Sequence, residues 1–523
     1  MTLACGGRAI DGAGGEEGTA GGGRGGGAGV DPGASASDPD VNPLGPSRPG
    51  SGMGRAGAGG LNGTPGGEPP GSEPPSGSGG SNTGPALATS DQDCFPDPIS
   101  LATTVEVLAN AAAAEAPADR PFIRYVSAGA HRTTCSPAVT RAAARARIAV
   151  DKLVNSLSIE AVPTPTRPLD AEALLLRLDL RDYGWARPIA VNGVTYPDGW
   201  DAIVAHSPMA LEFAGGDADV LKQRVGVPIP WLLAGSVVAA ASTGELYYAL
   251  TAASATLAEL KASLGITPPE DLPGGSWQRA GFSNSGVSPQ DRGVARYAGT
   301  ALGAGIFWQT FDYAPTTDSS SLFLEPLGAH GDAAEALYSL PNGLPAYFAA
   351  DAAGRRVTEA MFVVDPARAG ASRVMASCGS CHNTGVIAVE DAVRPFVEAN
   401  VAGTFTPGQV QAVRDAYPMP SVMQAMMDDD SARLQAALVQ AGQAADSPDP
   451  INRVALDYAL VVDHDVVARE LYVRPDAFEL DQLPPSLATA VTANGLSRAT
   501  LEASYRDALC VLHDGPVVPV GCP

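Results

Sequence analysis

Basic residues are scarce in this chain of 523 residues, which carries 33 Lys and Arg against 57 Asp and Glu. The formal net charge is −24 at pH 7. A chain with so few cations has no basic patch that could neutralise phosphates, which argues against nucleic acid as a partner. The acidic surplus favours a soluble protein, and it would also attract a basic redox partner.

Long apolar runs are missing as well. The best apolar stretch, Trp231 to Ala241, has eleven residues and follows Pro228 and Pro230. A helix needs about 20 apolar residues to cross a bilayer. We therefore predict a buried core segment here and no membrane-spanning helix. The folded part also lacks an HExxH zinc motif, a P-loop and a nucleophile elbow, which argues against the enzyme classes that those motifs define.

Aromatic residues are absent from Gly6 to about Ser90, where the chain consists almost entirely of Gly, Ala, Pro, Ser and acidic residues. Such a segment cannot bury enough apolar area to offset the entropy of ordering. We predict that residues 1–93 form a disordered Gly/Pro/Ser-rich tether. A GxGxxG-like run from Gly21 to Gly27 lies inside it, but no strand precedes the run and no helix follows it.

The first residues suggest export. Leu3-Ala4-Cys5-Gly6 resembles the end of a bacterial lipobox, in which Cys5 would carry the lipid. The basic and apolar regions of a signal peptide should come before it, so our hypothesis is a true start further upstream. A chance match is the alternative. The prediction is a bacterial protein exported to the periplasm or held at the outer membrane as a lipoprotein, with membrane association through the N-terminal lipid.

One pentapeptide has a spacing that dictates a specific chemistry: Cys378-Gly379-Ser380-Cys381-His382. CxxCH is the attachment site of a c-type haem. The two thiols lie one helical turn apart, so each can add to a vinyl group of the same porphyrin. The histidine that follows then serves as the proximal iron ligand. The motif predicts a covalently attached haem c, held by Cys378 and Cys381, with His382 on the iron.

Two other interpretations of this motif stay open. A zinc site would use the CxxC pair and His382, but the chain has no second CxxC or H-x(3–5)-H to complete four ligands. A thiol–disulfide redox couple normally lies between a strand and a helix of a thioredoxin-like unit. The flanking residues do not show that pattern clearly.

The sixth iron ligand is predicted to be Met419, which stands 37 residues after His382 between Pro418 and Pro420. The flanking prolines restrict the chain, which suits a methionine that must hold its sulfur on a metal. The alternatives are another methionine or histidine as sixth ligand, or an open sixth coordination site. The remaining histidines are expected to be core or surface residues: His131, His206, His330, His464 and His513.

Four cysteines remain besides Cys5 and the haem pair, an even number that fits two disulfides in an oxidising compartment. They are Cys94, Cys135, Cys510 and Cys522. Proximity in sequence favours Cys94–Cys135 and Cys510–Cys522, although four cysteines allow three pairings.

The folded part is predicted to be α+β: a mixed α+β accessory domain over 94–361, then a mainly α-helical, cytochrome c-like haem domain over 362–523. Apolar periodicity and turn residues carry this prediction. Helices are expected over 101–115, 138–156, 252–264, 392–400, 407–416 and 422–440, with three more after Ile451. Strands are expected over 174–180 and 306–313, and as a hairpin over 336–350 that turns at Pro341-Asn342-Gly343. Asp179, Arg181 and Asp182 are expected to form an ion-pair turn at a strand end rather than a catalytic cluster.

Several blocks occur in a fixed order before the CxxCH: 121–125 (PFIRY), 178–185 (LDLRDYGW), 279–288 (RAGFSNSGVS), 307–313 (FWQTFDY) and 340–344 (LPNGL). The ordered set resembles a family of large exported bacterial proteins with a single c-type haem site, described as cytochrome c domain-containing. The resemblance covers about residues 122–444. Where family members often have Arg-His after the Gly-Val-Ser block, this chain has Arg296-Tyr297.

The resemblance implies haem binding and electron transfer. Together with the motif, it predicts an exported monohaem c-type cytochrome that passes one electron to a redox partner protein. A haem enzyme with an open distal site, peroxidase-like or another oxidoreductase, is one alternative. A haem-based sensor or structural binding protein is the other. An electron carrier is favoured over a catalyst.

Overall fold

The computed structural model describes residues 99–523 apart from 132–136, 243, 267–276, 284–287, 289, 298–304, 314–321, 329–330, 366–369, 402, 445–448, 461 and 491–494. The described residues belong to one compact unit. Several predictions lie outside them: the tether over 1–93, the lipidation site at Cys5, the Cys94–Cys135 disulfide, and His330.

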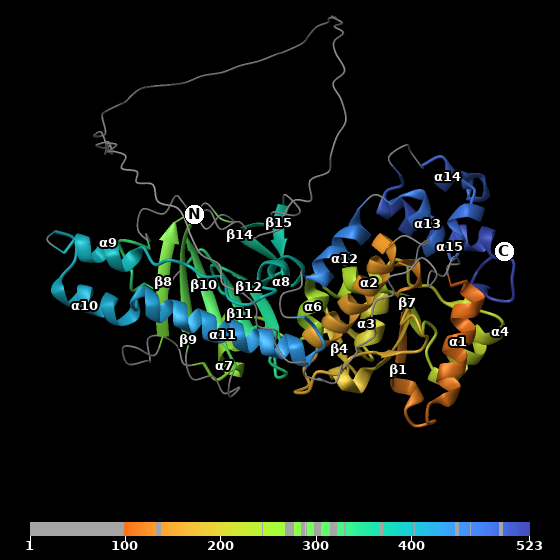
Figure 1. Cartoon of the computed structure of the whole chain (residues 1–523), viewed down its shortest axis with the longest axis horizontal. Coiled ribbons are helices and arrows are strands. Elements are labelled where there is room, and N and C mark those ends of the chain that lie inside the picture. Colours follow the sequence, from red (N-terminus) through yellow and green to blue (C-terminus); the bar gives the residue numbers. More distant parts are fainter. Residues whose placement is uncertain are drawn as a thin grey trace, which may run out of the picture. The chain divides into compact units, whose positions relative to one another are not determined.

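Helices and strands are both well represented, which confirms the predicted α+β class. Two sheets of four or more strands lie within the described residues (Figure 1). The smaller has the order β2-β3-β1-β7, with β1 antiparallel to β3 and parallel to β7. Its strands are β2 (Arg167–Pro168), β3 (Leu175–Asp179), β1 (Ile123–Ser127) and β7 (Trp231–Leu233).

The larger sheet is antiparallel throughout, in the order β13-β12-β11-β10-β9-β8. Its strands are β8 (Trp277–Ser283), β9 (Asp291–Tyr297), β10 (Phe307–Tyr313), β11 (Ala333–Ser339), β12 (Pro345–Asp351) and β13 (Arg356–Val357). Most residues of β10, β11 and β12 are buried, as expected of strands in the middle of a covered sheet.

The predicted hairpin is confirmed as β11 and β12, joined through the turn at Asn342 and Gly343. Gly343 has φ 81°, a left-handed conformation that a residue without Cβ adopts at little cost. The Asn342 side chain accepts a hydrogen bond from the Leu344 backbone N–H (3.0 Å) and donates one to the Asn155 carbonyl (2.9 Å). This turn therefore also ties the larger sheet to the helix that contains Asn155.

The predicted helices agree well with the structure. α1 (Leu101–Ala114), α2 (Pro137–Ser156), α9 (Val393–Ala399), α10 (Pro407–Ala416) and α11 (Pro420–Gln440) match within a few residues. α10 matches at both ends because Thr406 and Gln409 form a capping box ahead of the apolar positions. The helix expected over 252–264 is shorter, α7 (Leu257–Ser263), because Thr256 caps it from within that range.

Other helices were not predicted one by one. They are α3 (Gly199–Ala205), α4 (Gly216–Val225), α5 (Ala234–Ala241), α6 (Gly244–Leu250), α8 (Ala376–Cys381) and α14 (Pro485–Ala488). The three expected after Ile451 correspond to α12 (Pro450–Ala459), α13 (His464–Glu470) and α15 (Arg498–Leu512). The apolar stretch Trp231 to Ala241 forms β7 and α5, and most of it is buried. No described helix is long and apolar enough to cross a membrane.

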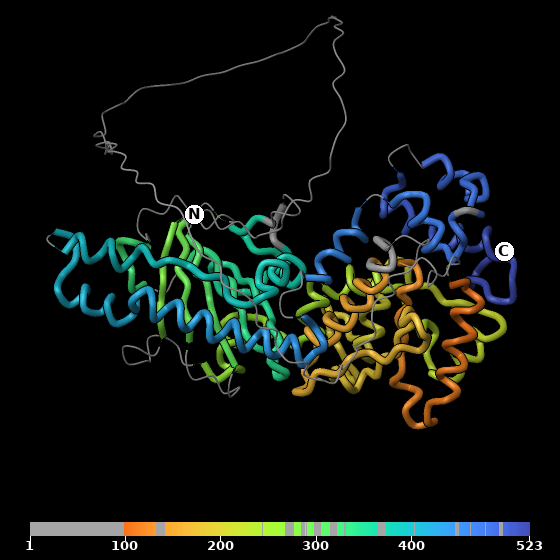
Figure 2. The backbone as a smooth tube through the Cα atoms, viewed as in Figure 1, coloured from red at the N-terminus to blue at the C-terminus, as the bar shows by residue number. Residues whose placement is uncertain are grey.

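The predicted division at residue 361 falls inside a strand, β14 (Glu359–Asp365), which pairs with β15 (Gly370–Arg373). Each of the two large apolar cores contains residues from both sides of residue 361. One contains α1, β1 and α4 together with α13 and α15, and the other contains α2 and α5 together with the larger sheet and α9–α12. Figure 2 shows the blue C-terminal helices beside orange and yellow segments from the first part of the chain. Within the described residues the C-terminal helices therefore do not form a separate core.

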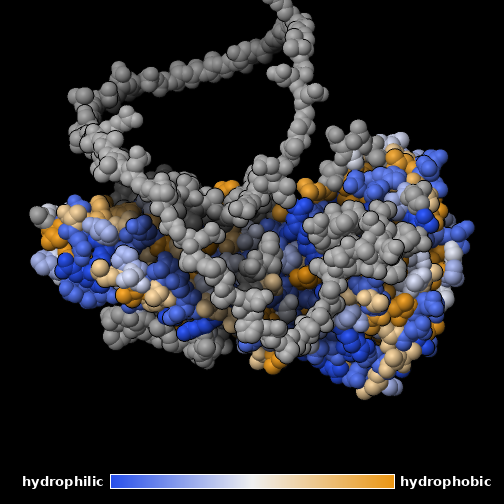
Figure 3. Space-filling view, in the orientation of Figure 1, coloured by the Kyte–Doolittle hydropathy of each residue, from blue (hydrophilic) through white to orange (hydrophobic). Residues whose placement is uncertain are grey.

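Helix α11 lies across the larger sheet (Figure 1) and is fixed to it by a buried carboxylate. Asp430 has no exposed surface and accepts hydrogen bonds from Arg296 Nε (2.6 Å), Arg296 Nη2 (3.1 Å) and Trp308 Nε1 (2.9 Å). Arg433 contributes a further ion pair at 3.5 Å. On the face of the molecule shown in Figure 3, hydrophilic residues cover much of the described surface, with hydrophobic residues scattered among them.

The end of β3 is held by charges, as predicted. Arg181 Nη2 lies 2.6 Å from Asp179 Oδ2, and Arg181 Nη1 lies 2.9 Å from Asp119 Oδ1. Asp179 also accepts the Arg181 backbone N–H, which starts the short 3-10 helix Leu180–Tyr183. These residues form an ion-pair turn, which is a structural role.

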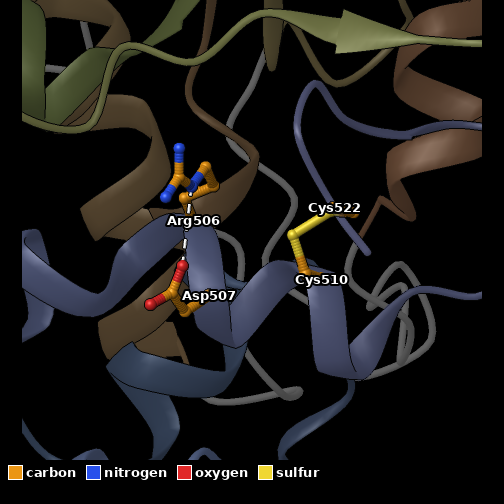
Figure 4. The surroundings of a disulfide bond; sticks show 4 residues. All are labelled: Arg506, Asp507, Cys510 and Cys522. Atoms are coloured by element: carbon orange, nitrogen blue, oxygen red, sulfur yellow. Dashed lines mark ion pairs between the residues drawn. A yellow bond between two sulfur atoms is a disulfide. The ribbon is translucent and has the colours of Figure 1, made fainter.

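The predicted disulfide between Cys510 and Cys522 is confirmed (Figure 4). It joins α15 to the C-terminal segment, whose strand β16 (Val518–Pro519) pairs with β6 (Phe213–Ala214). The bridge therefore anchors a short tail that completes a two-stranded sheet.

Replacing Cys510 and Cys522 together by Ala is expected to lower the free energy of unfolding by about 3 kcal/mol. The bridge spans 12 residues, and opening a loop of that size returns chain entropy of this order to the unfolded state. Urea unfolding of the double variant measures the change. A matched replacement of Asp507 by Asn, on the same helix but outside the bridge, should leave stability nearly unchanged.

Candidate functional site

The three residues of the motif lie together at the end of α8. Cys378 and Cys381 stand one turn apart on this helix, and His382 caps its C-terminus by donating its backbone N–H to the Cys378 carbonyl at 2.9 Å. Residues three apart on a helix share a face, as double attachment to one porphyrin requires. Met375, with φ 71°, makes the sharp entry from β15 into α8.

The His382 ring is oriented by a backbone carbonyl. Nδ1 lies 3.1 Å from the Gly385 oxygen. A carbonyl oxygen only accepts, so Nδ1 carries the proton and Nε2 keeps a free lone pair. Ligating histidines are held in this way at metal sites, where the hydrogen bond made by one ring nitrogen keeps the proton there and leaves the other nitrogen available to the metal. Burial lowers the pKa of His382, which also favours the neutral ring that a metal ligand requires.

A buried polar network holds the residue after the motif. Lys152 Nζ, on α2, donates to Asn383 Oδ1 (2.5 Å) and to Asp449 Oδ1 (2.7 Å). All three side chains are buried. Asp449 in turn caps α12 by accepting the Asn452 backbone N–H at 2.9 Å. The network joins α2, α12 and the end of α8, which are far apart in sequence.

The larger sheet lies on another side of the motif. The Tyr347 ring of β12 is 6.3 Å from the His382 ring, centroid to centroid. A Cβ on Gly379 would contact the Tyr347 ring at 3.7 Å and Asp449 Oδ2 at 3.9 Å. These are ordinary contact distances, so α8 packs closely at its glycine. Burial raises the pKa of Tyr347 well above its usual range, and the phenol therefore stays protonated.

The loop after His382 is held against α11. Gly385 has φ 129°, and a Cβ there would lie 2.5 Å from Ser431. Ser431 Oγ accepts the Val386 backbone N–H at 2.9 Å, and Gln435 Nε2 donates to the Thr384 carbonyl at 2.7 Å. The carbonyl that orients His382 thus belongs to a loop fixed by the middle of α11.

Met419 is not brought to His382. It stands at the N-cap of α11 with 55 % of its surface exposed. Of the two residues of that helix that bond to the loop, Ser431 and Gln435, the nearer is Ser431, twelve residues further on, or about 18 Å along the axis at 1.5 Å per residue. In this arrangement Met419 lies well away along α11 from the residues that hold the loop after His382.

A buried charge cluster on the sheet was missed by the sequence analysis. Arg292 of β9 lies 2.5 Å from both Asp312 Oδ1 (β10) and Glu335 Oε2 (β11). Burial raises the pKa of Asp312 well above its usual range, and the neighbouring Glu335 raises it further. Arg292 lowers and Glu335 raises the pKa of His382, so the cluster acts electrostatically on the motif. Each of the three residues comes from a different strand, so no contiguous stretch of sequence pointed to the cluster.

Cys381 is disulfide-bonded in this structure, but not to Cys378, which keeps its thiol. A sulfur in a disulfide cannot also form a thioether. Attachment of a porphyrin through Cys381 therefore requires its reduced thiol, and the two modifications exclude each other. No group of three or more His, Cys, Asp and Glu residues is arranged to hold a metal ion in the part of the chain that the structure describes.

The other described histidines have structural contacts. His206 Nδ1, His464 Nε2 and His513 Nε2 each lie within 3.0 Å of a backbone carbonyl oxygen. His131 is partly buried at the end of a short 3-10 helix, Gly129–His131. Burial lowers the pKa of His131 to about 4, and the positive charges of Arg469, Arg145 and Arg498 act in the same direction.

His131 should therefore make stability depend on pH. Between pH 6.5 and about 4 its ring binds a proton in the unfolded chain but not in the folded one. Stability is thus lost as the pH falls through this window. The full shift corresponds to about 3 kcal/mol, and because the ring is partly exposed we expect about 2 kcal/mol. Urea unfolding at several pH values measures it, and a His131→Gln variant should have a flatter profile. Equal slopes for the two proteins would contradict this assignment.

Comparison of the chain with protein-family models, with curated proteins and with solved structures finds no match in any of the three. The resemblance to the cytochrome c domain-containing family therefore remains a prediction from the residue blocks.

Proposed function

We propose that this chain is an exported bacterial protein that carries one haem c, attached at Cys378 and Cys381 with His382 as iron ligand, and that it transfers single electrons. The observation that supports this most directly is the tautomer of His382, because Gly385 leaves Nε2 unprotonated at the end of a CxxCH helix. The bound group would supply an iron that changes oxidation state by one electron.

The chain's own residues have defined tasks in this proposal. Gly385, held by Ser431, keeps the His382 ring in one orientation. Lys152 and Asp449 fix the end of α8 between α2 and α12. Tyr347 packs beside the ring and helps to exclude water from it. Met419 is left out of the proposed ligand set because of its position on α11.

A thiol–disulfide redox site is the second candidate, because Cys381 is disulfide-bonded, to a cysteine other than Cys378 of the same motif. In that case Cys381 exchanges its disulfide for a thiol, with two electrons and two protons supplied by a dithiol reductant. This reaction needs no porphyrin.

Expression in a periplasm with a haem-attachment system distinguishes the candidates. The proposal predicts a coloured protein whose pyridine haemochrome spectrum survives denaturation, and whose intact mass equals chain plus one haem. A colourless protein whose Cys381 disulfide is reduced by a dithiol would establish the second candidate instead. Carbon monoxide then tests the electron carrier. A low-spin spectrum unchanged by the gas supports it, whereas a high-spin spectrum that shifts indicates a haem enzyme or sensor.

A further inference from the structure

A second site of different chemistry lies away from the CxxCH motif. The structure contains a cavity of about 360 Å³ lined by residues of α5, α6, α12 and α15 and of the loops after β4 (Ile189–Val191) and α3. Tyr458 contributes from near the C-terminal end of α12, nine residues from Asp449, which is about 13 Å along the axis. The cavity therefore does not share its lining with the residues around His382.

The inner wall carries the buried hydroxyl of Ser236. Ser236 is 2 % exposed, and the Tyr458 phenol is the polar group that it interacts with. A hydroxyl can donate one hydrogen bond and accept two, so Ser236 keeps capacity for a further hydrogen bond to a ligand or water. The pKa of Tyr458 is raised by burial and further by Glu502, and it is lowered in part by Arg498 and by the hydrogen bond with Ser236. Tyr458 thus stays neutral and acts as a donor.

One of the two carboxylates that line the cavity has no ion-pair partner among the described residues. Glu502 accepts the Tyr458 hydroxyl at 2.7 Å and forms no ion pair among the described residues. The neighbouring cations are already engaged. Arg356 lies 2.5 Å from Glu245, and Arg498 binds Glu470 through both terminal nitrogens, at 2.5 and 3.1 Å. A cationic ligand would supply a counter-ion for Glu502.

The mouth of the cavity adds acceptors. His206 Nδ1 lies 2.8 Å from the Ala202 carbonyl, so Nδ1 carries the proton and Nε2 is left as an acceptor. Asn192, in the exposed turn after β4, offers an amide. With Glu502 and Ser236, the cavity presents acceptors to a ligand rich in N–H and O–H donors.

We propose that this cavity binds a hydroxylated organic ammonium compound of about the size of an amino sugar. Its ammonium group would pair with Glu502, and its hydroxyls would meet Ser236 and His206. The volume is at the small end of the range typical of ligand sites, roughly 300–1,000 Å³, which suits a single ring. This assignment does not depend on the haem proposal.

Calorimetric titration of the full-length protein with glucosamine, at a pH at which its amine is protonated, tests the site. Glucose is the matched probe, since it has the same ring without the charge. We expect glucosamine to bind and glucose to bind at least about tenfold more weakly, because a hydrogen-bonded charge is lost. High salt should weaken glucosamine binding. No heat of binding with glucosamine, or equal binding of the two sugars, would overturn the proposal.

Three variants locate the binding. Glu502→Gln should weaken glucosamine binding at least about tenfold, whereas Asp507→Asn, on the same helix but outside the cavity, should not change it. Ala239→Leu places a larger side chain in the cavity and should abolish binding while Glu502 is intact. If glucosamine still binds to Ala239→Leu with the affinity of the parent protein, the cavity is not the site. Circular dichroism spectra of the variants verify their folding.

Discussion

Replacing Cys378 and Cys381 together by Ala is expected to remove all covalently bound haem from protein matured in the periplasm. The two sulfurs are the only atoms of α8 that can form thioethers, and they stand one turn apart on the same short helix. With methyl groups in their place, no covalent bond can form. Haem staining after denaturing electrophoresis measures the loss, which should be complete.

The matched control is the double replacement of Cys510 and Cys522 by Ala, which also removes two sulfurs. It should keep its haem and lose only stability, because that disulfide anchors the tail after α15. Single variants add detail, since Cys378→Ala and Cys381→Ala should each retain at most one thioether. Covalent haem in the variant that lacks both Cys378 and Cys381 would contradict the proposed attachment site.

A His382→Ala variant separates iron ligation from attachment. Loss of the imidazole removes the Nε2 lone pair that Gly385 keeps available, while both thiols remain on α8. Any haem still attached should show a changed spin state in its absorption spectrum. A spectrum identical to that of the parent protein would rule out His382 as the iron ligand.

Local signals in the sequence predicted much of the fold. Apolar periodicity predicted the helix over 407–416, whose start the capping box of Thr406 and Gln409 fixes, and Asn342-Gly343 marked the turn between β11 and β12. Each signal consists of residues within one turn or one loop, where spacing alone fixes the geometry. The same holds for CxxCH, whose three functional residues lie within five positions at the end of α8.

Contacts between distant segments could not be predicted in this way. Lys152 and Asp449 meet next to the motif although almost 300 residues separate them. Met419 looked suitable because prolines flank it, but Pro420 starts α11, and the helix then reaches the motif only at Ser431. The division at residue 361 failed for a related reason, since a change in composition does not show which segments share a core.

A large loss of stability is expected on replacement of Asp430. Its carboxylate is fully buried and binds two nitrogens of Arg296 and the indole N–H of Trp308. Asp430→Ala leaves a largely buried guanidinium without its counter-ion and an indole N–H without an acceptor. Removing one partner of a buried pair costs about 3–5 kcal/mol. Because the Arg296 side chain keeps 20 % exposure and can regain some water, we expect about 3 kcal/mol.

Urea unfolding measures this change, and the neighbouring residue supplies the control. Asp429 is exposed on the same turn of α11, so Asp429→Ala should change the free energy of unfolding by no more than about 0.5 kcal/mol. Asp430→Asn keeps an acceptor but loses the charge, and it should lie between the two. Since α11 also holds the loop that orients His382, Asp430→Ala should in addition reduce the yield of haem-loaded protein. Equal stability of Asp430→Ala and Asp429→Ala would show that the buried carboxylate does not hold α11 on the sheet.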